Sequence, residues 1–208
     1  MARRTIVYVD GFNLYYGAVR GGPHKWLDLQ RYFTLLRPHD RIVQIHYFTA
    51  FLTGARQENQ KTYLKALATL PLVNIVLGQF KTKRVLCSVP GCTFGGSRWF
   101  DTPEEKRSDV NIGVQMVDDA YQNRCDAMVL VSGDSDLVPA VNMVKAQFPK
   151  MFVVVYVPAR SQIRGAAVQL RAAADRNKTL PLALLKHAQF PKAVPDGAGG
   201  VIQKPGAW

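Results

Sequence analysis

Short apolar runs alternate with amphipathic stretches along most of the chain. Five runs have the length and composition of strands, and they cover residues 5–10, 41–51, 72–80, 127–131 and 151–157. Apolar positions recur with helical spacing over residues 12–19, 27–36, 57–70, 106–123, 137–148, 162–174 and 180–187. The last two apolar runs have no polar alternation, which is typical of parallel strands buried on both faces. The pattern predicts an α/β fold with a mainly parallel sheet covered by helices on both sides.

Two segments interrupt this alternation. Residues 79–100 contain Gly, Pro and Cys at irregular spacing, which indicates a hairpin or an irregular insertion. Residues 189–208 are rich in Pro and Gly, and we expect them to form a disordered or loosely docked tail. The expected organisation is one domain over residues 1–188 followed by that tail.

The composition is that of a soluble globular protein, with 48% hydrophobic and 20% charged residues. The longest apolar run, residues 151–157, is too short to span a bilayer, so we expect no membrane partner. Asp10 interrupts the first apolar run, and we therefore expect no export signal. Cys87, Cys92 and Cys125 are too few for a disulfide framework, which favours a reducing cytoplasm.

The charge distribution is the first functional signal. Lys and Arg number 27 against 15 Asp and Glu, a net charge of +12. Residues 101–136 nevertheless hold nine acids and three bases, whereas the rest of the chain holds 24 bases and six acids. A charge run of this kind is usually a solvated helix. The alternative is a cation site within a surface that binds a polyanion, nucleic acid in the first place.

Acidic residues follow two of the predicted strands. Asp10 ends the first strand, and Asp134 and Asp136 come just past the fourth. If these strands are neighbours, the three carboxylates converge in the crevice where doubly wound sheets bind ligands. Asp109, near the start of its helix, could add a fourth carboxylate, and Asn13 could orient a ligand or a water molecule.

Crowded carboxylates repel one another unless they are protonated or paired with a cation. Mg²⁺ or Mn²⁺ suits a site made only of oxygen ligands and keeps several waters. Such a metal can bind a phosphate oxygen, activate water and stabilise the leaving oxygen. Each feature alone also has a structural explanation, since Asp-Gly is a common turn and Gly-Asp-Ser-Asp can cap a helix.

Three motifs carry a family resemblance. They are V-D-G-F-N-L at 9–14, E-K-R-S-D-V at 105–110 and V-S-G-D-S-D-L-V-P at 131–139. In order and spacing they resemble the signature blocks of the LabA-like NYN domains, which belong to the PIN-like nuclease superfamily, over roughly residues 4–176. The resemblance implies a Rossmann-like, three-layer α/β/α fold with strand order 3-2-1-4-5. It also implies a metal-dependent ribonuclease.

On these positions the resemblance assigns the metal to Asp10, Asp109, Asp134 and Asp136, with Asn13 as a supporting polar group. Many NYN domains carry a further Asp where this chain has Gln115. We interpret the following Asp118 and Asp119 as solvated or cap-like residues. Relatives of this subtype often have a closer cysteine pair than Cys87 and Cys92, which we expect to be loop thiols, free or occasionally paired, rather than zinc ligands.

Basic and aromatic residues interleave in the 79–100 segment, a composition that suits single-stranded RNA because bases stack on aromatic rings and phosphates pair with cations. The candidate RNA-binding residues there are Lys81, Lys83, Arg84, Arg98, Trp99 and Phe100. A second basic group after the last strand includes Arg160 and Arg164. The 79–100 segment could equally be a hairpin with solvated charges and partly buried aromatic rings, whereas for the second group the net charge of +12 favours contact with RNA over plain solubility.

We therefore expect a divalent-metal-dependent ribonuclease that uses Mg²⁺ or Mn²⁺. The alternative is a catalytically weak or inactive module of the same fold that binds RNA or regulates. A small-molecule phosphohydrolase is disfavoured, because such an enzyme needs no basic surface of this extent. The sequence lacks G-x-x-x-x-G-K-[ST], G-x-G-x-x-G and G-x-S-x-G, so nucleotide-driven, dinucleotide and serine-hydrolase chemistry have no motif to support them.

Overall fold

Six parallel strands form the central sheet of the computed structural model, which describes residues 2–52, 54, 57–160, 167–206 and 208. They are β1 (Arg3–Asp10), β2 (Asp40–Thr49), β3 (Val73–Leu77), β6 (Ala127–Val131), β7 (Phe152–Val157) and β8 (Arg176–Thr179). Their order is β3-β2-β1-β6-β7-β8, and every neighbouring pair is parallel. The predicted α/β fold with a mainly parallel sheet is confirmed.

The expected strand order 3-2-1-4-5 does not describe this sheet. A sixth strand, β8, extends the sheet beyond β7, and two strands of a separate hairpin precede β6 in the chain. The sequence of β8 is Arg-Asn-Lys-Thr, which has neither an apolar run nor a β-branched core. Its pairing to the buried strand β7 makes it a strand despite that composition.

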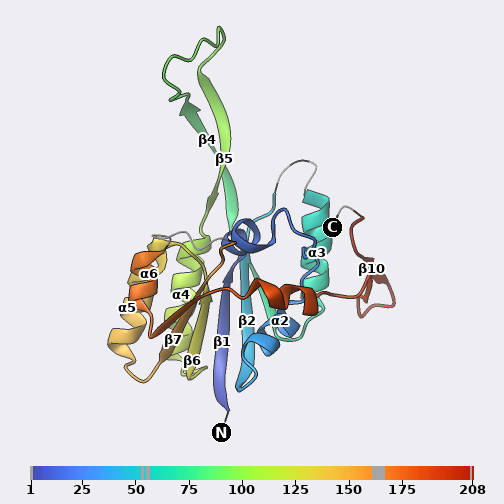
Figure 1. Cartoon of the computed structure of the whole chain (residues 1–208), viewed down its shortest axis with the longest axis vertical. Coiled ribbons are helices and arrows are strands. Elements are labelled where there is room, and N and C mark those ends of the chain that lie inside the picture. The colour runs from blue at the N-terminus through green and yellow to red at the C-terminus, as the bar shows by residue number, and fades with distance from the viewer. Residues whose placement is uncertain (1, 53, 55–56, 161–166, 207) are drawn as a thin grey trace.

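Helices cover both faces of the sheet (Figure 1). One face carries α1 (Gly11–Leu14), the π-helical turn η1 (Tyr15–Val19), α2 (Leu29–Leu36), α3 (Gln57–Ala68) and the 3-10 helix η4 (Leu182–His187). The other carries α4 (Ser108–Tyr121), the 3-10 turn η3 (Ser135–Leu137), α5 (Val138–Gln147) and α6 (Val168–Ala173). In β1, Val7 and Val9 pack on the first face and Ile6 and Tyr8 on the second, because successive side chains of a strand point to opposite sides.

Part of the predicted helix 162–174 lies outside the described residues, and the described part is α6. Within the described ranges, none of the helices combines the length and the apolar character needed to cross a membrane.

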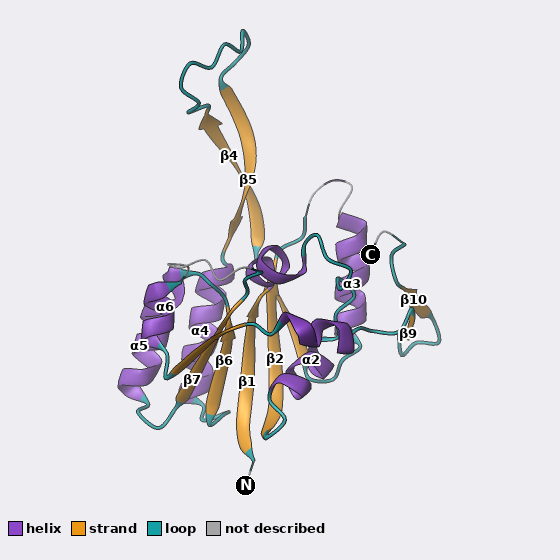
Figure 2. Ribbon diagram, viewed as in Figure 1, coloured by secondary structure: helices purple, strands orange, loops and turns teal. Residues whose placement is uncertain are grey.

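A two-stranded arm projects from the body at the edge where α1 lies (Figure 1). It consists of the antiparallel strands β4 (Gln79–Leu86) and β5 (Trp99–Lys106), paired from Gln79 with Lys106 to Leu86 with Trp99. The segment expected as a hairpin or an insertion is therefore a hairpin that runs on to residue 106. The arm leaves the sheet after β3 and returns directly into α4, as Figure 2 shows, so its base lies at the carboxyl edge of the sheet.

The end of the chain packs on the body, in contrast to the loosely docked tail that its composition predicts. Strands β9 (Ala193–Pro195) and β10 (Val201–Gln203) form a small antiparallel sheet. Phe190 and Val194 are buried in the core of the first face. The Trp208 ring lies 5.6 Å from that of Tyr63 and 6.4 Å from that of Trp26. A few large apolar anchors fix a segment whose Pro and Gly content excludes long helices or strands.

Candidate active site at the carboxyl edge of the sheet

Asp10 is the last residue of β1, and hydrogen bonds fix its carboxylate. Its Oδ1 accepts a hydrogen bond from the Asn13 backbone N–H at 3.0 Å, which caps helix α1. Its Oδ2 accepts from Asn13 Nδ2 at 2.6 Å and from Ser132 Oγ at 3.0 Å. Ser132 follows β6, so the pairing of β1 with β6 brings the two strand ends together as expected.

Asn13 and Ser132 connect this carboxylate to the loop after β6. Asn13 Oδ1 accepts a hydrogen bond from the Gly133 backbone N–H at 3.1 Å. Ser132 Oγ accepts one from the Asp134 backbone N–H at 3.1 Å, and Asp134 Oδ1 accepts one from the Asp136 backbone N–H at 2.9 Å. Asp10, Asn13 and the 132–136 loop therefore form one continuous hydrogen-bonded unit, in which Asn13 orients its neighbours.

Gly11 allows the close approach on which this unit depends. A Cβ at residue 11 would lie 2.7 Å from the Phe48 carbonyl oxygen and 2.8 Å from the Tyr47 hydroxyl oxygen. Both contacts are shorter than a side chain tolerates, so a larger residue would push α1 away from β2 and move Asp10 with it.

Asp109, in the first turn of α4, is surrounded by negative charge. Burial and the charges of Asp134, Asp10, Glu105 and Asp136 raise its pKa to about 6. This shift opposes the helix N-terminus, which favours an ionised aspartate. The pKa of Asp10 is also raised, mainly by burial, although its hydrogen bonds with Asn13 and Ser132 act against that effect.

No cation balances these acids among the described residues, where the ion pairs involve neither Asp10, Asp109, Asp134 nor Asp136. Sequence reasoning did not assign Glu105 to the site, although it lies in the same motif as Asp109. Its Oε1 accepts hydrogen bonds from Ser108 N–H and Oγ–H, and it lines a cleft of about 990 Å³ together with Asp109 and Asp136.

The expected metal ligands do not form a ready-made cage. Over the part of the chain that is described, no three His, Cys, Asp or Glu side chains lie close enough together to hold a metal ion. The donor chemistry still fits Mg²⁺ or Mn²⁺, because the site offers carboxylate oxygens with uncompensated charge. Magnesium needs only one or two carboxylates when water and substrate phosphates complete its shell.

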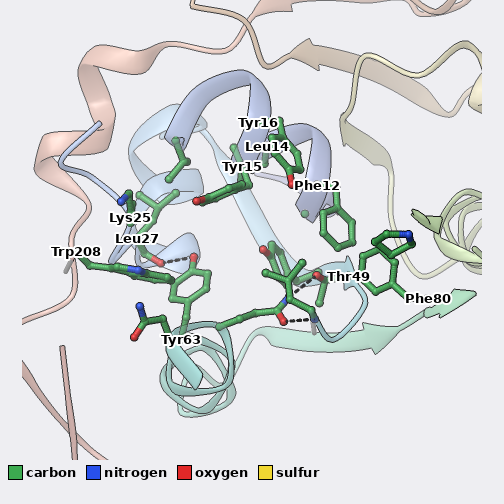
Figure 3. A pocket seen from close by; sticks show the side chains of 17 residues that line it. Phe12, Leu14, Tyr15, Tyr16, Lys25, Leu27, Thr49, Tyr63, Phe80 and Trp208 are labelled. Carbon is green, nitrogen blue, oxygen red and sulfur yellow. Dashed lines mark hydrogen bonds between the residues drawn. The ribbon is translucent and has the colours of Figure 1, made fainter. Parts of the chain in front are cut away.

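An aromatic cavity of about 650 Å³ adjoins the acidic unit (Figure 3). Gly11 and Phe12, the residues directly after Asp10, form part of its wall. Its aromatic lining comes from α1, η1, β2, α3, β4 and the chain end, namely Phe12, Tyr15, Tyr16, Tyr47, Tyr63, Phe80 and Trp208. Sequence reasoning missed this cavity and placed residues 12–19 only in a helix. The available signal was the density of aromatic residues directly after Asp10.

The family model of the NYN domain matches residues 4–180. The chain belongs to the NYN domain family. NYN domains are of the PIN-like nuclease type, so the expected superfamily is confirmed. The matched range holds all five residues expected at the acidic site as well as the whole arm.

Two individual proteins resemble this NYN domain protein. A Pseudomonas putida protein named 6-hydroxy-3-succinoylpyridine 3-monooxygenase HspA is 30% identical over 237 residues, which cover 99% of this chain and 75% of that protein. A crystal structure of a Vibrio parahaemolyticus protein of unknown function, VPA0982, superposes with a TM-score of 0.51 at 18% identity. It covers 86% of this chain and 94% of the other. The second likeness supports the fold alone.

The NYN domain buries Asp119, which we expected to be solvated or cap-like. This carboxylate is 1% exposed and accepts hydrogen bonds from Tyr8 Oη at 2.7 Å, Arg124 Nη1 at 2.7 Å and Gln115 Nε2 at 3.1 Å. His46 Nε2 lies 3.5 Å from it. Burial alone would raise the pKa of Asp119, but the hydrogen bonds from these groups outweigh burial and lower it. Gln115 therefore serves this buried network.

The arm carries the expected RNA-binding residues of the NYN domain in exposed positions. Trp99 and Phe100 are about half exposed. Lys81, Lys83, Arg84 and Arg98 are exposed as well. The Arg98 side chain donates a hydrogen bond to the Cys87 carbonyl at 3.0 Å, and Lys83 lies 3.7 Å from Glu104. Cys87 and Cys92 are free thiols.

In the second basic group, Arg160 is exposed but its guanidinium is bound to the body of the protein. The Arg160 guanidinium donates hydrogen bonds to the carbonyls of Ala18 and Val19, at 3.3 and 3.2 Å for Nη2, and so fixes the end of η1. Arg164 lies outside the described residues.

Proposed function

We propose that this protein is a divalent-metal-dependent ribonuclease that hydrolyses RNA phosphodiester bonds at the Asp10 edge of the sheet. The observation that carries the proposal is the hydrogen-bonded unit of Asp10, Asn13 and the 132–136 loop, beside which Asp109 has acidic neighbours and no cation partner among the described residues. Unbalanced negative charge next to an ordered carboxylate is costly, and a cation that arrives with its substrate relieves it. Within the NYN family, the resemblance of the three motifs supports assignment to the LabA-like subfamily as part of this proposal.

Each residue of the site has a distinct task. Asn13 and Ser132 hold the Asp10 carboxylate in one orientation through hydrogen bonds to both of its oxygens. Asp10 and Asp134, with Asp109 and Asp136 beside them, would hold Mg²⁺ or Mn²⁺. When bound, the metal supplies an activated water and stabilises charge on the phosphate oxygens. The arm, with its basic and aromatic side chains, would hold the RNA strand.

The alternative within the same fold is a catalytically weak or inactive module that binds RNA. The lack of a preformed group of three metal-ligating side chains in the described ranges favours it, as does Gln115 in place of a further acid.

A second candidate function is oxidation of a small aromatic substrate. The name of the Pseudomonas putida relative and the aromatic cavity beside Asp10 favour it. Oxygen consumption measured with 6-hydroxy-3-succinoylpyridine, reduced nicotinamide and flavin tests it, and consumption equal to that without the pyridine excludes it.

Cleavage of a labelled single-stranded RNA tests the main proposal. We expect cleavage with Mg²⁺ or Mn²⁺, none with excess EDTA, and a loss of at least about a hundredfold in Asp10→Asn. The matched control is Asp126→Asn. Asp126 is exposed, pairs with Arg4 and lies directly before β6, at the end of that strand away from the acidic site. Cleavage that persists undiminished in EDTA contradicts the metal mechanism. Tight RNA binding without cleavage under any divalent metal favours the binding module.

A further inference from the structure

The aromatic cavity next to Asp10, with a volume of about 650 Å³, is larger than an ordinary packing void, and different side chains line its two ends. Figure 3 shows the side chains of Phe12 and Phe80 at one end and those of Lys25 and Trp208 at the other. The Phe12 and Phe80 rings meet edge to face, with centroids 5.6 Å apart. Rings at both ends suit a flat aromatic group, and the ammonium at one end suits a phosphate attached to that group.

We propose that this cavity receives one unpaired base of an RNA strand, so that the adjoining phosphate lies at the Asp10 edge. The inference rests on the proposed ribonuclease function and names its substrate as single-stranded RNA with one base turned out of the stack. We call the part of the cavity that would hold the base the base seat. Asp10 caps α1, and Gly11 and Phe12 of α1 line the cavity, so residues 10–12 belong to both the acidic site and the base seat.

Unused polar groups in the wall fit the edge of a base. Tyr47 is 7% exposed, and its hydroxyl has no hydrogen-bond partner among the described residues. Burial, together with the nearby Asp10, raises the pKa of Tyr47, so the hydroxyl keeps its proton and can donate. The Asn59 amide also lines the cavity and makes no hydrogen bond to a described residue, so it offers both a donor and an acceptor.

Other polar groups of the wall are already committed. Tyr63 Oη donates to the Leu27 carbonyl at 2.8 Å. The Gln60 amide accepts from the Leu52 backbone N–H at 2.7 Å and donates to the Ala50 carbonyl at 2.9 Å. Lys25 makes no ion pair with a described residue, so its ammonium is available to a phosphate.

The position of the arm indicates that the occupant of the cavity is a base of an RNA strand and not a free small molecule. Phe80 of β4 and Pro103 of β5 belong to both the base of the arm and the cavity wall. The arm face that carries Phe80 and Pro103 also carries Arg84 and Trp99, since alternate residues of a strand share a face. A single strand can run along that surface and place one base inside, since aromatic side chains stack on any base.

The test measures binding of a fluorescent single-stranded RNA to the full chain in EDTA, by anisotropy across a salt series. Phe80→Ala should lower affinity at least about fivefold without changing the salt slope. Lys25→Gln should flatten that slope by about one unit. Tyr47→Phe removes one hydroxyl and keeps the aromatic ring, so it tests the hydrogen bond to the base without changing the shape of the cavity. It should lower affinity by about twofold to tenfold. The control is Leu35→Ala, an exposed apolar residue of α2 that lines neither the cavity nor the acidic cleft, and it should bind as the wild type does.

A second series of binding measurements uses RNAs in which one nucleotide at a time lacks its base. At one position the abasic RNA should bind the wild type less tightly, and there the loss should not add to that of Phe80→Ala. If the affinity losses from the missing base and from Phe80→Ala add at every position, or if all variants bind equally, the base seat is overturned. Neither result would contradict the proposed ribonuclease function, which cleavage of RNA by the wild type tests separately. If the cavity variants weaken binding of 6-hydroxy-3-succinoylpyridine but not of RNA, the cavity is a small-molecule site and the proposal is wrong.

Discussion

The two ends of helix α4 hold aspartates in opposite surroundings. Asp119, near its end, is buried but receives hydrogen bonds from Tyr8, Gln115 and Arg124, and its pKa is lowered despite burial. Asp109, in its first turn, has four acidic neighbours and no cation partner in the described chain, and its pKa is raised to about 6. The same residue type, ten positions apart, is paired with hydrogen-bond donors at one end and has no cation partner among the described residues at the other, where our proposal puts a metal ion.

The difference distinguishes an aspartate with a structural role from a candidate functional one, and it does so without using the sequence motif around either residue. A protein that needs a charge only for stability surrounds it with partners, as it does for Asp119. A charge left without partners lowers stability, and a group of this kind is a candidate for a functional role.

The largest expected effect is at the compensated end. Asp119→Ala should lower the free energy of unfolding by about 3–5 kcal/mol, because it leaves the Tyr8 hydroxyl and Arg124 without their buried partner. Urea unfolding near pH 7 measures this loss. Asp118→Ala is the control, since Asp118 is exposed and pairs with the same Arg124, and it should cost no more than about 1 kcal/mol. Equal losses in both variants would remove the distinction between the two ends of α4.

At the uncompensated end the effect should fall on activity. Asp109→Asn should reduce metal-dependent RNA cleavage at least about a hundredfold, because it removes a charge that faces the cation. The same variant should be at least as stable as the wild type in EDTA, since it relieves repulsion. A variant that unfolds readily but cleaves RNA normally would reverse the assignment.

How far the sequence predicts this comparison depends on the range of the contacts involved. Asp10 and Asp134 could be placed at one edge because Asp10 ends one apolar strand and Asp134 comes just past another, and parallel strands end at the same side. The partners of Asp119 could not, because Tyr8 and His46 lie on strands more than seventy residues away and share no motif with it.

Two further features depended on tertiary context. Strand β8 has no strand-like composition and exists because β7 offers an edge to pair with. The aromatic cavity is assembled from helices, strands and the chain end, whose order along the chain gives no hint that they meet. Trp208 closes it only because the Pro- and Gly-rich segment before it packs on the body.

The two aspartates should also give stability opposite dependences on pH. Asp109 has a folded pKa of about 6 against a usual 3.8, so the folded state holds its proton longer than the unfolded chain. Its contribution should therefore fall as pH rises from about 4 to about 6 and stay constant above. For Asp119 the folded pKa is lowered, so its contribution is present above the unfolded pKa and disappears as pH falls through the folded one. Unfolding free energies in EDTA from pH 3 to 7, for the wild type and Asp109→Asn, measure the first dependence. An unchanged difference between the two proteins over that range would contradict it.

The smallest expected effect extends the comparison to cations. Arg124 is committed to Asp118 and Asp119, whereas Arg84 on the arm makes no ion pair with a described residue. Arg84→Ala should flatten the salt dependence of RNA binding by about one unit and leave stability unchanged. Lys61→Ala, a cation on α3 that pairs with Glu58, should leave the salt slope as it is. Identical slopes in all three proteins would place the RNA away from the arm.

The most direct measurement of the central claim is a carboxyl ¹³C NMR titration of Asp109 and Asp119 in the same protein, with and without Mg²⁺. Without Mg²⁺, Asp109 should titrate with a pKa of about 6, and Asp119 should stay ionised to lower pH than an ordinary aspartate. Saturating Mg²⁺ should lower the pKa of Asp109 by at least about one unit, because an opposite charge nearby favours the ionised form, and should leave Asp119 unchanged. Identical titration of Asp109 with and without Mg²⁺ would contradict a metal site at this edge of the sheet.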